Sequence, residues 1–372
     1  MQEGRVLGLI VNPVAGMGGA VGLKGTDGAE ALAEALRRGA RPSSCGRARA
    51  FVSGFSALRT AVSFVTCRGA MGEDAFAGGG YRVRVLEVGG GATGAGDTRD
   101  AARIMEGMGV QMIAFCGGDG TARDIMDAVG ERVPVLGIPA GVKMHSGVFA
   151  VTPEAAAGIA MRFIWGELPL MRGEVADVDE EAFRQGRVSS RLYGYLSVPH
   201  EPAGMQGMKA ATPLTEDAEE NRQAIARWVV ESMEKGVVYL LGPGSTVKAI
   251  SEALGIDYSL LGVDIVLDGK LVRKDAGEEE VMAAISGRDG RIIVSPIGRQ
   301  GFIFGRGNQQ ISGRALRALG RGAVTVVSTR EKLEGIEAIR ADTGDREVDG
   351  WFRGGVKVLV DYNTFRMKRS EC

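Results

Sequence analysis

The sequence predicts an α/β protein whose N-terminal half is built on a parallel sheet with helices on both faces. Apolar segments of strand length alternate with amphipathic segments of helical period over the first half of the chain. Glycine makes up 58 of the 372 residues and clusters directly after apolar runs, at roughly twice the usual ~7%. The length exceeds what one hydrophobic core usually covers, so two domains are expected.

The first half alternates strand, turn and helix in chain order. Residues 5–11 (RVLGLIV) form a strand that ends at the breaker Asn12-Pro13 and a glycine-rich loop. The following elements are a helix over 29–40, a loop over 88–96, a helix over 97–109 capped by Asp97 or Thr98, a strand over 110–116, a helix over 122–130 and a strand with its turn over 133–141. Residues 49–80 have no clear period.

The texture changes between residues 165 and 210, where polar and apolar residues alternate around turn signals, as in antiparallel hairpins. We therefore predict a phosphate-binding α/β domain over 1–155 and a second, mixed α/β or β-rich domain over 156–372. An alternative that stays open is that a C-terminal segment packs back on the first domain. The second half shows a helix over 216–235, a strand, turn and helix over 237–255, a hairpin over 260–272, a helix over 278–287, a strand over 291–295, a long loop over 296–310, a helix and a strand over 323–329.

Composition argues against several classes of partner. The 45 basic and 46 acidic side chains balance, so no strong field favours nucleic acid or a membrane surface. No apolar run reaches membrane-spanning length and no cleavage pattern follows the N-terminus, which indicates a cytoplasmic protein. The four cysteines have no paired spacing and there are two histidines, so any metal is expected to have oxygen ligands.

The stretch Gly117-Gly118-Asp119-Gly120-Thr121 joins a strand to a helix. Glycines allow a sharp turn, and free N–H groups at a helix start favour phosphate oxygens. Thr121 and Asp124 have capping-box spacing. A carboxylate beside phosphate is unfavourable unless it binds Mg²⁺ or accepts a proton from an attacking hydroxyl, so Asp119 is the candidate catalytic residue. An ordinary turn, in which Asp119 bonds to backbone, is the alternative, and the two loops described next count against it.

Two further loops are expected on the same sheet edge, because successive parallel strands end there. One contains Asn12. The other, GIPAGVKMHSG, contains Lys143, which could neutralise a phosphate charge, and His145. An ordinary loop around Asn12 and a structural histidine are the alternatives, and the second is favoured for His145.

A loop near residue 300 has donors and acceptors suited to a nucleotide. Phe302 and Phe304 precede Arg306, Asn308, Gln309 and Gln310. Arg306 could stabilise a transferred phosphoryl group, and a domain or subunit contact is an equal alternative. The DTGD stretch at 342–345 is better explained as a capped turn than as a metal site. Walker, protein-kinase and G-x-S-x-G signatures are absent. No G-x-G-x-x-G fingerprint with a downstream acid follows the first strand, which disfavours hydride transfer.

Six motifs together carry a resemblance that spans nearly the whole chain: VNPVAGMGG, GLKGTDG, CGGDGTARDI, GIPAGVKMHS, LGPGSTVKAI and GFIFGRGNQQIS. They resemble the ATP-NAD kinase-like family, which includes the acetoin-catabolism X protein. That family lies within the superfamily of NAD kinases, diacylglycerol kinases and phosphofructokinases. The resemblance implies a Rossmann-like N-terminal domain, with ATP and Mg²⁺ bound between it and the second domain, and NAD (2′-OH) as the best acceptor, giving NADP.

The resemblance also implies roles for particular residues. Asp119 would be the catalytic carboxylate, and a direct Mg²⁺ ligand only as an open alternative. The nucleotide-binding residues would be Asn12, Gly117, Gly118, Gly120, Thr121, Lys143, Gly244, Ser245 and Thr246, to which we add Arg306 and Asn308 from their own chemistry.

One departure affects the acceptor. NAD kinases grip the dinucleotide with an Asn-Glu pair, whereas the nearest acidic segment here has Glu174, Asp177 and Asp179 without that dipeptide. A kinase for another small hydroxyl metabolite, linked to acetoin catabolism, and a nucleotide-binding regulator without catalysis therefore stay open. So do polyphosphate as donor and a homo-oligomer, the latter by analogy alone.

Overall fold

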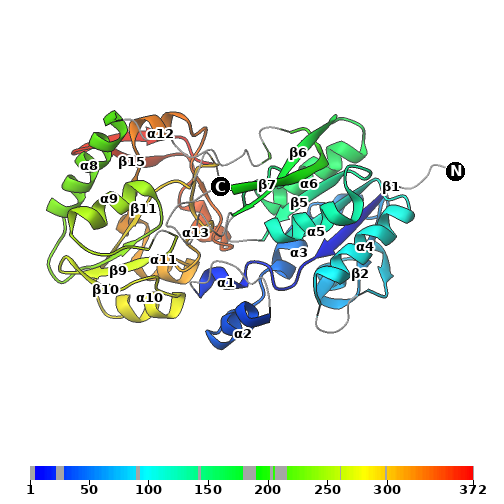
Figure 1. Cartoon of the computed structure of the whole chain (residues 1–372), viewed down its shortest axis with the longest axis horizontal. Helices are drawn as coiled ribbons and strands as arrows, with labels where there is room; N and C mark the ends of the chain where they lie inside the picture. Colours follow the sequence, from blue (N-terminus) through cyan, green and yellow to red (C-terminus); the bar gives the residue numbers. More distant parts are fainter. Residues whose placement is uncertain are drawn as a thin grey trace. The chain divides into compact units, whose positions relative to one another are not determined.

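A computed structural model describes residues 5–21, 29–88, 93–140, 144–178, 190–201, 204–205, 216–259, 261–297 and 300–371. The chain divides into two compact units (Figure 1). Unit 1 comprises Met1–Met17, Gly25–Leu36 and Arg41–Met208, and unit 2 comprises Gly18–Lys24, Arg37–Ala40 and Lys209–Cys372. Both units are α/β, as predicted.

Unit 1 is built on a parallel sheet with the strand order β3-β2-β1-β4-β5. The strands are β1 (Arg5–Val11), β2 (Val62–Cys67), β3 (Arg82–Leu86), β4 (Met112–Gly117) and β5 (Val135–Pro139). Every residue of β4 is buried, because helices cover the sheet on both sides. From β1, the chain adds β2 and β3 on one side of the sheet and then β4 and β5 on the other. The carboxyl ends of β1 and β4 therefore lie side by side at the switch point, where such sheets bind ligands.

The two faces of this sheet have separate apolar cores. Helices α3 (Ser44–Ser53) and α6 (Pro153–Ile164) cover one face. Helices α4 (Ala95–Gly107) and α5 (Asp119–Val129) cover the other. The short helices α1 (Met17–Ala20) and α2 (Ala29–Arg37) follow β1. Helix α4 begins at Ala95, two residues before the predicted cap, and Asp97 instead accepts a hydrogen bond from the Gly94 N–H.

The antiparallel hairpin of β6 (Leu170–Val178) and β7 (Ser190–Pro199) belongs to unit 1. Its residues Val175, Leu196 and Val198 are fully buried in the α4–α5 core. The hairpin was expected to open the second domain, but this packing keeps it with the first. The predicted boundary at 155/156 falls inside α6, and the units divide instead after Met208.

Unit 2 contains a second sheet with the order β10-β9-β8-β11-β13-β15-β16. Its four central strands are parallel: β8 (Val238–Leu241), β11 (Gly290–Val294), β13 (Val324–Val327) and β15 (Val356–Asp361). The edges are antiparallel, with β9 (Asp264–Leu267) and β10 (Lys270–Arg273) on one side and β16 (Thr364–Lys368) on the other. The predicted mixed α/β alternative is therefore confirmed over a β-rich one.

Helices cover both faces of this second sheet as well. Helices α8 (Glu216–Glu231) and α9 (Ser245–Ala253) pack on one face. The other face carries α10 (Glu278–Ile285), α11 (Gly313–Leu319), α12 (Arg330–Glu334), α13 (Arg346–Gly350) and the small sheet of β12 (Phe302–Phe304) with β14 (Arg340–Ala341). The prediction of loop over 296–310 is wrong at β12, whose three residues are too short a run to stand out from the surrounding glycines.

Candidate functional site

The turn between β4 and α5 differs in detail from its prediction. Gly118 has an extended backbone and its carbonyl accepts a hydrogen bond from the Ala122 N–H at 3.0 Å, which starts α5 at Asp119. Thr121 is therefore the third residue of the helix and not its cap. Asp124 pairs with Arg99 at 3.1 Å. The predicted capping box is wrong, because the glycine leaves the helix free to begin earlier.

Asp119 lies at the centre of a buried network and is only 5% exposed. Its Oδ2 accepts a hydrogen bond from the His145 N–H at 2.7 Å, and its Oδ1 accepts one from the Ser146 N–H at 3.0 Å. Ser146 Oγ in turn donates to the Ala176 carbonyl of β6 at 2.9 Å. The carboxylate thus ties the start of α5 to the segment after β5, and the turn interpretation accounts for part of its role.

The electrostatics of Asp119 go beyond those of a turn residue. Burial raises the pKa of its carboxyl to about 6, although the bonds from Ser146 and His145 oppose the rise. The nearby Asp177 carboxylate, which pairs with Arg123 at 3.2 Å, adds to it. Desolvation therefore outweighs the favourable α5 N-terminus and the two N–H donors. A carboxyl that titrates near neutrality is suited to accept a proton.

Asn12 connects the end of β1 to the start of α5. Its N–H donates to the Cys116 carbonyl at 2.9 Å, and its Nδ2 donates to Thr121 Oγ1 at 3.0 Å. A Cβ at Gly117 would lie 2.4 Å from that same oxygen, so the position requires glycine. The predicted residues Asn12, Gly117, Gly118, Asp119, Gly120 and Thr121 therefore gather at the carboxyl ends of β1 and β4. Lys143 and Asp179 lie outside the described residues.

His145 contributes to this network through its backbone N–H, which donates to Asp119. Its side chain is buried. Glu174 and Asp177 both lie on β6. The sequence analysis missed Ser146, and the hydroxyl three residues after the predicted Lys143 was the available signal.

In unit 2, Gly244 joins β8 to α9 and caps that helix, so that Ser245 and Thr246 form its first turn. Gly244 has φ +124°, a conformation that side-chain-bearing residues rarely adopt. Thr246 is 1% exposed, and its Oγ1 has no hydrogen-bond partner among the described residues. Gly244, Ser245 and Thr246 therefore lie at a helix start, where the Thr246 hydroxyl is buried without a hydrogen-bond partner among the described residues.

The loop after β12 is buried: Arg306, Asn308 and Gln310 have little exposure to solvent. Arg306 pairs with Asp342 at 3.2 Å and lies over the Phe302 ring at 4.8 Å. Asn308 donates from Nδ2 to the Ile303 carbonyl at 2.8 Å. The side-chain carbonyl oxygens of Asn308, Gln309 and Gln310 have no partner among the residues that the structure describes. Phe302 and Phe304 lie in the core of unit 2, which explains their spacing without a ligand.

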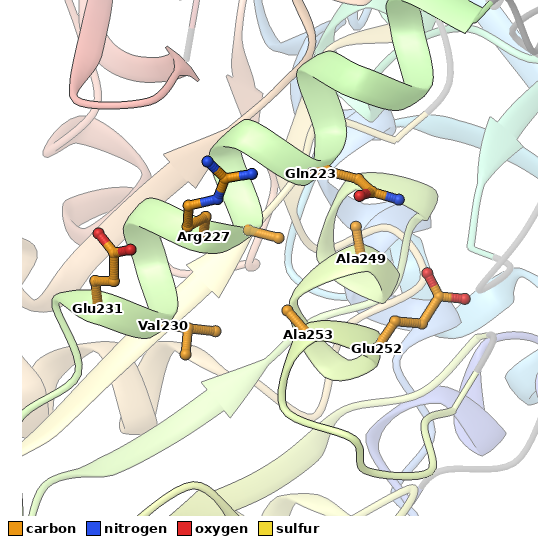
Figure 2. A pocket seen from close by; sticks show the side chains of 8 residues that line it. Gln223, Arg227, Val230, Glu231, Ala249, Glu252 and Ala253 are labelled. Atoms are coloured by element: carbon orange, nitrogen blue, oxygen red, sulfur yellow. The ribbon is translucent and has the colours of Figure 1, made fainter.

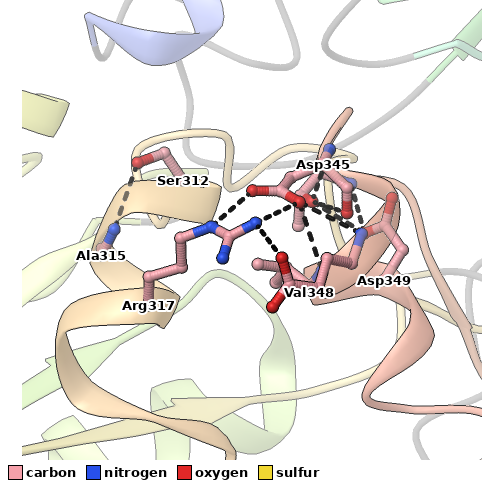
Figure 3. Close-up of polar contacts among 8 residues, drawn as sticks. Ser312, Ala315, Arg317, Asp345, Val348 and Asp349 are labelled. Atoms are coloured by element: carbon pink, nitrogen blue, oxygen red, sulfur yellow. Dashed lines mark hydrogen bonds and ion pairs between the residues drawn. The ribbon is translucent and has the colours of Figure 1, made fainter.

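The DTGD stretch forms a capped turn, as favoured (Figure 3). Asp345 caps α13 by accepting hydrogen bonds from the N–H groups of Glu347 and Val348, and it pairs with Arg317 at 2.8 Å. Thr343 Oγ1 donates to Asp349 at 2.7 Å. Across the described part of the chain, no group of three or more histidine, cysteine or acidic side chains is placed to hold a metal ion.

A groove of about 400 Å³ runs between α8 and α9 (Figure 2). It is lined by Gln223, Arg227 and Glu231 of α8 and by Ala249, Glu252 and Ala253 of α9. None of the predicted site residues lines the groove, and its charges are mixed. We assign it no chemistry.

Comparisons with known proteins identify the class of the chain. The model of the ATP-NAD kinase N-terminal domain matches residues 7–168, and the model of the ATP-NAD kinase C-terminal domain matches residues 234–370. The two matches follow in the expected order and cover most of the sequence. The chain belongs to the ATP-NAD kinase family. A search of curated proteins gives no match.

Solved structures from Bacillus anthracis str. Sterne resemble part of the chain. A diacylglycerol kinase matches with 16% identity and a TM-score of 0.25, over 48% of each chain. A second structure, described as a candidate diacylglycerol kinase, matches with 17% identity and a TM-score of 0.25, over 48% of this chain and 47% of its own. The chain thus spans about half the length of these structures, and a likeness this weak supports no conclusion.

None of the helices among the described residues combines the length and apolarity needed to cross a membrane.

Proposed function

We propose that this protein is an ATP-dependent kinase that transfers the γ-phosphoryl group to a hydroxyl of a small molecule, with the 2′-OH of NAD as the first candidate and NADP as the product. The carrying observation is Asp119, a buried carboxyl at a glycine turn whose pKa is raised to about 6. Membership of the ATP-NAD kinase family supports the phosphotransferase class. We expect the protein to be cytoplasmic and to act on small molecules rather than on nucleic acid or membranes. Assembly into a homo-oligomer stays an open alternative.

The reaction requires a base for the acceptor. The acceptor oxygen forms a bond to the γ-phosphorus, the bond between that phosphorus and the β,γ-bridging oxygen breaks, and ADP leaves with the electron pair. The hydroxyl proton passes to Asp119, which is ionised above pH 6 and therefore available at neutral pH. The N–H groups in the first turn of α5, with Gly117, Gly118, Gly120 and Thr121, would hold phosphate oxygens.

The described residues fit Mg²⁺ only in part. Both Asp119 oxygens already accept backbone hydrogen bonds, and no acidic cluster accompanies them in the described chain. Mg²⁺ usually keeps its waters and phosphate ligands and needs one or two carboxylates. Asp119 is therefore better placed as a base than as the centre of a metal cage. The ion, when bound, would neutralise charge on the transferring phosphate.

The remaining predicted residues would hold the nucleotide. Asn12 would fix the first phosphate loop through its bond to Thr121, and Lys143 would add a positive charge. Gly244, Ser245 and Thr246, which lie in unit 2, are further proposed nucleotide-binding residues. The unused carbonyl oxygens around Asn308 suit the N–H and O–H donors of a base or ribose. Because Arg306 already pairs with Asp342, we expect it to orient this loop rather than meet phosphate.

The first test is incubation of the purified protein with Mg-ATP and NAD, with NADP read out by an NADP-specific dehydrogenase. Asp119→Asn should lower the rate of product formation by about 10²- to 10⁴-fold, and Asp124→Asn is the matched control, since Asp124 lies on the same helix but pairs with Arg99. Full turnover by Asp119→Asn would remove this residue from the mechanism.

A second acceptor class is favoured by the absence of an Asn-Glu pair near Glu174. If NAD yields no NADP, a panel of small hydroxyl compounds should be screened for stimulated ATP consumption, with polyphosphate as the alternative donor. Tight ATP or NAD binding without transfer to any acceptor would favour a regulator.

A further inference from the structure

A lysine in unit 2 lies at the carboxyl edge of the parallel sheet and has no acidic partner among the described residues. Lys332 belongs to α12, which follows β13, and its Nζ donates to Ser295 Oγ at 3.0 Å. Ser295 directly follows β11 and is 1% exposed. The lysine as a whole keeps partial exposure to solvent. The ammonium is thus held at the sheet edge and stays within reach of a ligand.

The surroundings of Lys332 are electropositive. Among the described residues, the charged group that acts on it is Arg222 of α8, a buried cation. Arg222 is paired with Glu219, whereas Lys332 pairs with no carboxylate among the residues that the structure describes. Burial and Arg222 together lower the pKa of Lys332 to about 8. Buried charges are normally paired, so this arrangement lacks an anion.

The β8–α9 turn reaches the same place. A Cβ on Gly244 would lie 3.6 Å from Ser295 Cβ and 4.0 Å from its Oγ. Gly244 is the cap of α9, and the first N–H inside the helix to find a carbonyl is that of Lys248, at 2.9 Å from Gly244 O. The N–H groups of Ser245, Thr246 and Val247 precede it, and a nine-residue helix adds its positive end.

A buried hydroxyl completes the arrangement. Thr246 Oγ1 has no hydrogen-bond partner among the residues described, although the residue is 1% exposed. A buried polar atom without a partner costs roughly 1–3 kcal/mol. The hydroxyl can donate to an anion bound at the start of its own helix, which would remove this cost.

We propose that Lys332, Ser295 and the first turn of α9 form an anion site that takes a phosphate group. Phosphate fits better than carboxylate, because the donors come from three separate elements and a tetrahedral anion offers oxygens in several directions. The proposal rests on the proposed function in one respect: Gly244, Ser245 and Thr246 are among its nucleotide-binding residues. It adds a cation that the sequence reading did not identify, and it needs no phosphoryl transfer.

The test observes Lys332 itself. In protein carrying ¹³C-labelled lysine, the Lys332 side-chain signal is assigned by its loss in Lys332→Met, and inorganic phosphate, pyrophosphate, ATP and NAD are then added separately. We expect the Lys332 signal to shift and saturate with phosphate or pyrophosphate. A response to these ions identifies a general phosphate site, and a response to ATP or NAD alone identifies a nucleotide site. No shift with any of the four at millimolar concentration would overturn the proposal.

Matched variants keep the result specific. Calorimetry of the responding ligand should show affinity reduced by about tenfold or more in Lys332→Met, with partial recovery in Lys332→Arg. Lys270→Met, on the exposed edge strand β10, should bind as the wild type does. In Asp119→Asn the Lys332 response should persist, which separates failure of this site from failure of the proposed kinase chemistry.

Discussion

The β4–α5 turn of unit 1 and the β8–α9 turn of unit 2 are built alike and charged oppositely. Each runs from a buried parallel strand through glycine into the first turn of a helix. The first places the buried acid Asp119 in that turn, and the second lies beside Ser295, the partner of the base Lys332. Burial moves both pKa values toward neutrality, upward for the acid and downward for the base. We therefore propose that the same local geometry serves proton transfer in one unit and anion binding in the other.

The largest expected effect separates chemistry from binding. With an accepted substrate pair, Asp119→Asn should lower kcat by about 10²- to 10⁴-fold, the usual contribution of a general base. Lys332→Met should raise KM about tenfold with little change in kcat, since it removes ground-state binding. Steady-state kinetics over both substrates distinguish the two. If Asp119→Asn and Lys332→Met lowered kcat equally, the proposed division between a catalytic turn and a binding turn would be wrong.

The free energy of unfolding should fall as pH rises from about 4 to 6. The native Asp119 carboxyl titrates near pH 6 and the unfolded one near 3.8, so the native state binds more protons in this interval. The expected loss is about 3 kcal/mol. Urea unfolding at several pH values measures it, and Asp119→Asn should remove this component of the slope. An unchanged slope in the variant would assign the pH dependence elsewhere.

Lys332 should produce the opposite dependence at higher pH. Its pKa is about 8 in the folded protein and 10.5 in the unfolded chain. Because the unfolded state binds more protons between these values, stability should rise across this interval by up to about 3 kcal/mol. In Lys332→Met this rise should disappear, while Lys270→Met retains it. Bound phosphate should diminish the rise in the wild type by keeping the lysine charged.

A methyl group on the glycines of the two turns should destabilise the protein for different reasons and to similar degrees. Gly117→Ala should cost about 1–3 kcal/mol, because the new Cβ lies 2.5 Å from Thr121 Cβ. Gly244→Ala should cost about 1–3 kcal/mol through its positive φ. Gly158→Ala in α6 meets nothing within 4 Å and should be neutral or stabilising. Thermal unfolding ranks the three, and a loss in Gly158→Ala as large as in the turns would contradict this account.

The smallest effect concerns the link between β1 and α5. Asn12→Ala removes the bond to Thr121 Oγ1 and the bond that Asn12 Oδ1 accepts from the Val14 N–H, for a loss of about 1 kcal/mol. Denaturant unfolding measures it. In Thr121→Val, which lacks the same acceptor, the further substitution of Asn12 should cost less. Full additivity of the two losses would show that the bond contributes nothing.

Much of this architecture could be predicted from local patterns. The apolar period identified β1, β4 and β5, and the alternation of strand and helix predicted a parallel sheet in unit 1. Glycine after an apolar run located both turns. The helix starts were less well predicted, because the extended Gly118 and the Asp97 bond to Gly94 move them by two or three residues. The 170–199 hairpin was recognised but placed in the wrong unit, since its period does not reveal which core its inward residues join.

By itself, the sequence determined the class of fold, the glycine turn that carries Asp119 and the membership of a kinase family, because these depend on residues close together in the chain. Tertiary structure decided the pKa values of the buried charged side chains and the groups that they contact. The pKa of Asp119 depends on burial and on His145 and Ser146, 26 and 27 residues away. Lys332 meets Ser295 across 37 residues and nothing in its local sequence indicates an anion site. Desolvation and charge pairing are properties of the packed surroundings, and periodicity along the chain does not contain them.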